Sequence, residues 1–181
     1  QKEKKMRPFE ISKDTYQYFD MGRITQDLEF SEKLYEEAVQ LVQEKKIVLN
    51  EVSVGYARII NHVSLCGVAR GSHQDYGVAR RIEIMFCREG LIRAKCEVRG
   101  CGGRYENAQY YNTKVICKHM LALMLLLDEY LKKYNPGDST DEDGNMLVNA
   151  FRNLHYKEVM EKQQEEVNDF VVEPVLERNG N

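Results

Sequence analysis

The spacing of hydrophobic residues changes near residue 52, from the helical period to the alternation that is typical of strands. Before that point, Ser31 can cap a helix whose apolar positions share one face: Leu34, Tyr35, Ala38, Leu41 and Val42. After it, residues 52–60 and 62–70 have the pattern of strands, and residues 71–75 form a polar turn. The pattern therefore predicts one amphipathic helix followed by a sheet.

Two further alternating segments predict a β-hairpin. Residues 82–87 and 91–98 each alternate apolar with polar positions, and Arg88-Glu89-Gly90 separates them. We expect a small antiparallel sheet of four strands, with one face packed and the other in water.

A polar segment, residues 102–114, is expected to form a long loop that leads to the most apolar helix of the chain. This helix begins around Cys117, extends to about Tyr134 and ends before Asn135-Pro136-Gly137. Because it is apolar nearly all round, it has to be buried, and we expect it to pack across the apolar face of the sheet.

Four potential metal ligands lie around the start of that helix. They are Cys96, Cys101, Cys117 and His119, in the spacing Cys-x4-Cys-x15-Cys-x-His. Three thiolates and an imidazole suit zinc, and a closed site with four protein ligands leaves no position for a substrate. The positive end of the helix dipole also favours the thiolate form of Cys117. The pattern predicts a structural zinc site.

The identity of the first ligand stays open. Cys96 falls on the apolar face of its strand, which also fits a buried core thiol. The replacement would then come from Cys66, Cys87, His62 or His73, although the two cysteines are most simply small buried hydrophobes. Glycines at 100, 102 and 103 surround Cys101 and would let a wider turn return to the metal.

These elements predict an α+β fold: a small antiparallel sheet with a zinc-knuckle hairpin packed on a buried helix, flanked by N- and C-terminal helices. We expect three parts. Residues 1–50 are an N-terminal helical segment, and residues 51–135 are the zinc-binding module. Residues 136–181 are an acidic linker, an amphipathic helix with Leu147, Phe151, Leu154 and Val159, and the truncated start of a following domain.

The net charge of -3 conceals an uneven distribution. Residues 52–120 hold 11 Lys or Arg against 5 Asp or Glu, whereas residues 121–181 hold 6 against 13. A basic module beside an acidic tail indicates polyanion contact. The expected nucleic-acid-binding residues are Arg80, Arg81, Arg93, Lys95, Arg99, Arg104, Lys114 and Lys118, with Arg70 beside them; the alternative is an ordinary solvated surface.

Composition narrows the class of protein. In 181 residues of 43% hydrophobic content, the longest apolar run, residues 120–127, is far shorter than the roughly 20 residues that span a membrane. Five cysteines are an odd number, which favours reduced thiols in the cytoplasm over a disulfide framework. We expect a cytoplasmic protein, and, since the sequence begins with Gln, a piece of a longer polypeptide.

Other chemistry is not expected. An acidic stretch with Gly144 at the sixth position of a calcium loop would place Ala150 where the bidentate Glu belongs. The sequence has no phosphate-binding Gly-x-x-x-x-Gly-Lys-Ser/Thr motif, and no third group is evident to orient His119 as a base for Cys117. We therefore expect no enzymatic activity in this chain.

Cys117-Lys118-His119 followed by Met120-Leu121-Ala122, after a hairpin that ends in cysteines, resembles the SWIM zinc finger, in which Cys-x-Cys precedes Cys-x-His at a helix start. Residues 56–60, 63–68 and 81–84 are similar to the strands before this finger near the N-terminus of bacterial Swi/Snf-family helicases, and residues 173–176 resemble the entry to the domain that follows. The wider spacing between Cys96 and Cys101, with Val98 or Arg99 in place of a family cysteine, is a departure.

The resemblance implies a zinc-binding accessory module of a bacterial Swi/Snf-type DNA translocase, whose ATPase motor lies elsewhere in the polypeptide. Its expected partner is DNA. The alternative is a protein-interaction or intramolecular regulatory module that docks on the helicase motor or on another protein and has no DNA binding of its own. SWIM fingers also accompany transposases, which is a less favoured context.

Overall fold

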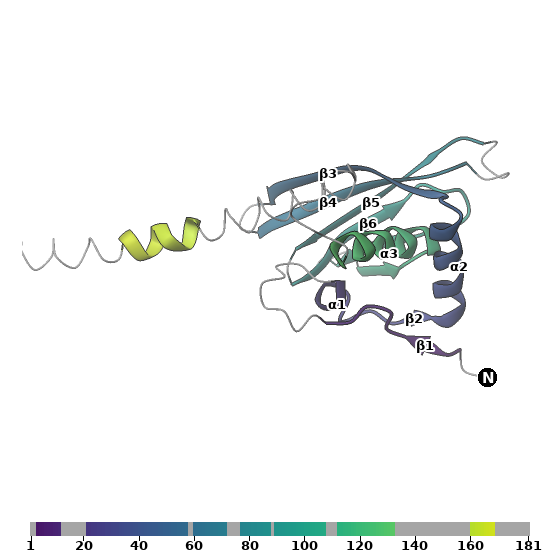
Figure 1. Cartoon of the computed structure of the whole chain (residues 1–181), viewed down its shortest axis with the longest axis horizontal. Coiled ribbons are helices and arrows are strands. Elements are labelled where there is room, and N and C mark those ends of the chain that lie inside the picture. The colour runs from purple at the N-terminus through teal and green to yellow at the C-terminus, as the bar shows by residue number, and fades with distance from the viewer. Residues whose placement is uncertain are drawn as a thin grey trace, which may run out of the picture.

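In a computed structural model of the chain, the fold is an antiparallel sheet with a long helix across one of its faces (Figure 1). The structure describes residues 3–11, 21–57, 60–71, 77–87, 89–107, 112–132 and 160–168. Within them, the α+β class predicted from the sequence is confirmed.

The main sheet has six strands, each antiparallel to the next, in the order β3-β4-β5-β6-β7-β8. They are β3 (Ile47–Ala57), β4 (Ile60–Ala69), β5 (Arg80–Cys87), β6 (Gly90–Cys96), β7 (Arg104–Asn107) and β8 (Asn112–Val115). Because the spatial order follows the chain order, the sheet is a meander in which every neighbour is local in sequence.

The prediction of a long polar loop over residues 102–114 was wrong, because this segment carries β7 and nearly all of β8. All four residues of β8 are exposed, and β7 buries only Tyr105. Such strands lack the hydrophobic alternation on which a sequence-based prediction depends. The sheet therefore has six strands rather than the four expected. The first strand also begins at Ile47 instead of Val52, with Ile47 and Leu49 buried on alternate positions.

Helix α3 (Lys118–Lys132) is buried as predicted, with Met120 to Met124 and Leu127 at 2% exposure or less. It contacts β3, β5 and β6 on the inner face of the sheet, where Leu65, Ile82 and Ile84 are equally buried. A helix that is apolar nearly all round over residues 120–127 can lie there because the sheet covers one side and other elements cover the rest. The expected end near Tyr134 lies outside the described residues.

Helix α2 (Glu32–Gln43) covers a second side of α3 (Figure 1). The predicted cap is confirmed, since the Leu34 N–H donates to the Ser31 hydroxyl at 3.1 Å. Ala38 is fully buried, with Leu34, Tyr35, Leu41 and Val42 packed around the same core, as the spacing predicted. This helix therefore closes the core beside α3.

The N-terminal part contains three short elements that the sequence did not predict. Strand β1 (Lys5–Met6) pairs antiparallel with β2 (Phe30–Ser31), and α1 (Met21–Ile24) is a single helical turn. Phe9 meets Phe30 edge to face, with ring centroids 6.4 Å apart. These short elements hold the entry to α2 against the core.

Toward the C-terminus, residues 160–168 form a helix in which every residue is exposed (yellow in Figure 1). The predicted helix positions Leu147, Phe151, Leu154 and Val159, the acidic stretch before Gly144 and the extended segment 170–176 lie outside the described residues. The domain boundaries after residues 50 and 135 stay predictions.

Candidate metal centre

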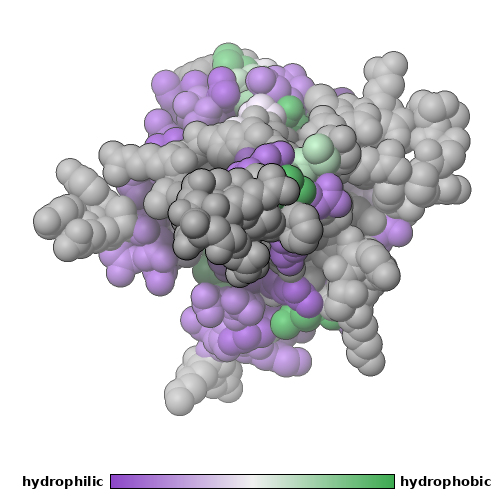
Figure 2. All heavy atoms as spheres, turned by 90° about the vertical axis from the view of Figure 1, so that its left-hand side faces the viewer, coloured by the Kyte–Doolittle hydropathy of each residue, from purple (hydrophilic) through white to green (hydrophobic). Residues whose placement is uncertain are grey.

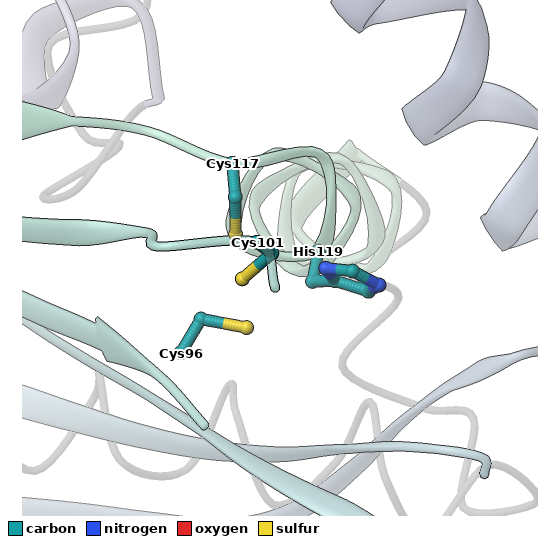
Figure 3. Close-up of side chains that lie close together, drawn as sticks. All are labelled: Cys96, Cys101, Cys117 and His119. Atoms are coloured by element: carbon teal, nitrogen blue, oxygen red, sulfur yellow. The ribbon is translucent and has the colours of Figure 1, made fainter. Parts of the chain in front are cut away.

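The structure brings Cys96, Cys101, Cys117 and His119 together at the junction of β6 and α3 (Figure 3). Their ligand atoms all lie within 4.8 Å of one another. Cys96 is the last residue of β6, Cys117 stands immediately before α3, and His119 is in its first turn. Within the described part of the chain, no other group of three or more Cys, His, Asp or Glu has this arrangement.

Cys117 caps the N-terminus of α3 with its sulfur. The Met120 N–H points at the Cys117 sulfur at 3.4 Å, and the Leu121 N–H donates to the Cys117 carbonyl at 3.1 Å. A sulfur in this position receives both a backbone donor and the positive end of the helix dipole, which stabilise a thiolate. The sequence-based placement of Cys117 at the helix start is therefore confirmed.

The turn between Cys96 and Cys101 accommodates the wide spacing. The Cys101 N–H donates to the Val98 carbonyl at 3.4 Å, and Gly100 and Gly102 have φ angles of 77° and 64°, which favour glycine. The Cys96 N–H donates to the Gly103 carbonyl at 3.1 Å, and this hydrogen bond joins the two ends of the turn. The extra residues are absorbed in this turn, and Cys101 still returns to the cluster.

Gly103 is the point of closest backbone approach. A Cβ on Gly103 would lie 2.6 Å from the Cys117 sulfur and 3.3 Å from the Cys96 Cβ. The Gly103 N–H also points at the Cys101 sulfur at 3.5 Å. No other residue type could pass here without displacing a thiol, so Gly103 is part of the site although it offers no ligand atom.

His119 is 8% exposed, and its Nδ1 atom is buried without a hydrogen-bond partner in the described structure. One nitrogen of its ring faces the three sulfur atoms (Figure 3). An unpaired buried imidazole nitrogen costs free energy unless something binds it. A cation bound among the thiols would satisfy this atom.

The thiols differ in their tendency to ionise. The Cys96 thiol, the neighbouring His119 ring and the Met120 N–H lower the pKa of Cys117, against the effect of burial. The hydrogen bond of the Cys96 thiol to Cys117, together with burial, raises the pKa of Cys96, and burial raises the pKa of Cys101. Before a metal binds, the negative charge of the cluster therefore resides on Cys117.

The alternative first ligands do not join this cluster. Cys66 and Cys87 are buried free thiols in β4 and β5, and burial raises the pKa of each. The Cys66 thiol lies 3.8 Å from the Gly67 carbonyl. His62 is not part of the cluster either, and His73 lies outside the described residues. The placement of the four sulfur and nitrogen donors thus favours Cys96 over its replacements.

The basic residues singled out from the sequence do not share one surface. Arg81, Arg93, Lys95 and Arg104 project from the outer face of the sheet, away from α3, as the strand register requires. Lys114 pairs with Tyr105 across β7 and β8, so its side chain belongs to the other face of the sheet. Arg99 lies in the turn between Cys96 and Cys101. Arg80 and Lys118 are half-buried, at the start of β5 and of α3.

Carboxylates are interleaved with these cations on the outer face. Arg81 pairs with Glu83 at 2.8 Å and Arg104 with Glu106 at 3.2 Å, in each case two residues along the same strand. Arg81, Arg93 and Lys95 also line a hollow of about 160 Å³ to which Glu51 and Glu83 contribute. The outer face is therefore strongly charged but not uniformly positive.

Figure 2 views the molecule from the left of Figure 1, and there the coloured surface is mainly hydrophilic, with apolar residues in small separate patches. None of the described helices is long and apolar enough to cross a membrane. Comparison with protein-family models finds no match, and comparison with curated proteins and with solved structures finds none either.

Proposed function

We propose that Cys96, Cys101, Cys117 and His119 bind one structural zinc ion. The observation that carries this proposal is the convergence of three thiols on a buried imidazole nitrogen that has no other partner among the described residues. Tetrahedral zinc with Zn–S bonds of about 2.3 Å separates its sulfur ligands by about 3.8 Å. The ligand atoms, all within 4.8 Å of one another, need to close by only about 1 Å to reach that geometry.

Bound zinc would join three separate parts of the chain: the end of β6, the glycine turn and the start of α3. All four coordination positions are supplied by side chains, so the ion has no open position for a water or a substrate. Its contribution is then to the folding free energy of this corner of the sheet.

The test is metal content per chain, with thermal stability, for the parent protein and for Cys96→Ser, Cys101→Ser, Cys117→Ser and His119→Gln. We expect one zinc per chain in the parent and loss in each variant. Cys66→Ser and Cys87→Ser are matched controls, since they remove buried thiols that lie outside the cluster and should keep the zinc. Charge-transfer absorption of the Co²⁺ form reports the number of thiolate ligands. Zinc retained in Cys96→Ser alone would exclude Cys96 as a ligand.

We further propose that the zinc-stabilised fold is an accessory binding module of a Swi/Snf-type DNA translocase, and that it contacts DNA. The support is the Cys-x-His pair at the start of a buried helix, the strands before it, and the cations of the outer face. Arg93 and Lys95 are exposed neighbours on one strand and are the best placed to meet phosphates.

Binding of a short duplex at several salt concentrations tests this role. Arg93→Gln/Lys95→Gln should reduce the slope of log affinity against log salt by about 1 for each phosphate that the variant no longer neutralises. Lys5→Gln/Lys33→Gln removes two exposed cations away from this face and should leave the slope unchanged. No salt-dependent binding in the zinc-loaded protein would remove the DNA proposal.

One observation favours a second candidate, a module that binds protein rather than DNA. The ion pairs Arg81–Glu83 and Arg104–Glu106 and the carboxylate of Glu51 offset most of the positive charge on the outer face. A face with both signs of charge suits a partner protein with a complementary pattern better than a uniform polyanion. Absence of DNA binding, with the zinc site intact, would select this candidate.

A further inference from the structure

A second hollow lies beside the end of β6 that is farther from Cys96. It has a volume of about 190 Å³. Its walls come from three places: the end of α1 and the turn after it, the β5–β6 connection, and β7. Ile24, Leu28 and Leu91 supply its apolar surface.

Tyr105 lines this hollow with an unpaired polar group. The side chain belongs to a residue that is only 5% exposed, yet its hydroxyl makes no hydrogen bond to any described residue. The ring is buried, whereas the hydroxyl reaches solvent at the hollow, because it is not among the buried polar atoms that lack a partner. A ligand group that displaces water from this hydroxyl has to offer it a hydrogen bond in return. The hollow is the place from which a ligand can supply one.

The described residues that line the hollow include two carboxylates. Asp27 and Glu89 are exposed at its lining, Asn107 adds an amide, and no Lys or Arg is among the described residues that line it. The charge of Asp27 acts on the phenol as well, since burial and Asp27 together raise the pKa of Tyr105. Burial, followed by a hydrogen bond with the Glu89 side chain, raises the pKa of the Cys87 thiol, which also lines the hollow. A cation is therefore the ligand that these groups favour.

The size and the walls limit what that cation can be. A volume of about 190 Å³ is smaller than the roughly 300 Å³ at which pockets for whole small molecules begin, so a nucleotide or cofactor does not fit. A naked metal ion would leave the apolar walls without a contact. A basic side chain matches both parts, because its methylene stem packs on apolar surface while its charged head meets carboxylates and the hydroxyl.

We propose that this hollow binds a basic side chain, arginine or lysine, presented by a partner protein. The partner's cationic group donates to the Tyr105 hydroxyl and to the carboxylates of Asp27 and Glu89, and the stem lies on Ile24, Leu28 and Leu91. This site is independent of the zinc proposal, since none of its residues belongs to the cysteine cluster.

The experiment is an NMR titration of the uniformly ¹⁵N-labelled chain with three capped tripeptides, Gly-Xaa-Gly, in which Xaa is arginine, lysine or norleucine. We expect saturable shifts of the amides of Asp27, Glu89, Leu91 and Asn107 with arginine and lysine. Norleucine has an apolar chain of similar length and no charge, so it should give no saturable shift. The shifts should weaken as salt is raised.

Variants identify the groups that bind. Tyr105→Phe keeps the ring and removes the hydroxyl, and should weaken binding about five- to tenfold; Tyr35→Phe makes the same change in α2 and should have no effect. Asp27→Asn/Glu89→Gln should abolish the saturable shifts, whereas Glu36→Gln/Glu51→Gln removes two exposed carboxylates elsewhere and should not. An unchanged dispersed spectrum in each variant verifies the fold. Equal binding of the norleucine peptide, or unchanged binding by the Asp27/Glu89 variant, would overturn the proposal.

Discussion

The backbone of Gly103 lies directly against the thiol of Cys117, so that a Cβ on Gly103 would stand 2.6 Å from that sulfur. The same residue accepts a hydrogen bond from the Cys96 N–H. One glycine thus sets the separation between the strand that carries Cys96 and the start of the helix that carries Cys117.

Gly103→Ala should therefore weaken zinc binding by about tenfold or more, as changes next to metal ligands commonly do. The added methyl group must displace Cys117 or move β7 away from β6. Competition with a chromophoric chelator measures the affinity. Gly90→Ala is the matched control, because its Cβ would meet nothing closer than 3.8 Å. Equal affinity in both variants would show that the corner adapts without cost.

Zinc binding near pH 7.5 should release about two protons from the thiols of the cluster. The pKa of Cys117 is lowered, so this group is already a thiolate, whereas the pKa values of Cys96 and Cys101 are raised and both remain thiols. Protons are released rather than taken up, because all three cysteines must be thiolates to bind zinc. Calorimetry in buffers with different ionisation enthalpies counts the protons; release of three would mean that Cys117 is not ionised beforehand.

Removal of the metal should loosen one corner of the fold and leave the rest. The segment from Cys96 to Cys117 contributes few buried side chains, whereas Leu65, Ile84 and Leu123 belong to a core that does not depend on the ion. After chelation, hydrogen exchange should accelerate in β7, β8 and the first turn of α3, with slow exchange retained in β4 and β5. Exchange that accelerates throughout would mean that the apolar core cannot fold without zinc.

Gly67→Ala should destabilise the fold by about 1–3 kcal/mol, because the new methyl group would lie 2.8 Å from the Leu123 side chain. Combination with Leu123→Ala tests the cause, since that change opens space at the same contact. The double variant should then be destabilised by less than the sum of the two single costs in denaturant unfolding. Simple additivity would place the strain elsewhere, for example at the Val48 carbonyl 3.3 Å away.

Ser31→Ala should reduce the free energy of unfolding by about 1 kcal/mol, because the Leu34 N–H loses its acceptor at the start of α2. Ser53→Ala removes a hydroxyl from an exposed position of β3 and serves as the control. Both values come from urea denaturation with the zinc concentration held constant. A loss as small as that of the control would mean that water replaces the cap.

The elements that the sequence predicted are those whose side chains carry a periodic signal. α2 has a cap and an apolar stripe, α3 is apolar nearly all round, and β5 and β6 alternate over most of their length, apart from a register shift between Met85 and Phe86. β7 and β8 have no such signal, because only Tyr105 is buried among their eight residues. Their pairing is specified by the sheet they extend.

The candidate metal centre was predictable as a set of four residues but not as a geometry. Residue type and spacing named Cys96, Cys101, Cys117 and His119, whereas the role of Gly103 depends on a backbone contact between segments that are not adjacent in sequence. The hollow beside Tyr105 had no sequence signal at all. Its residues come from three elements, and only the folded sheet brings Asp27 near Asn107.

The pairing of β7 with β8 sets Arg104 opposite Val115, next to the cysteines, and Asn107 opposite Asn112 at the far end of the same two strands. The end of the two strands at Arg104 and Val115 alone determines how Cys101 and Cys117 approach each other. Residues inserted beyond Asn107 would lengthen the connection without moving either sulfur. Chains that share this centre are therefore expected to differ widely in the number of residues between their second and third cysteines, and a search by fixed spacing would overlook many of them.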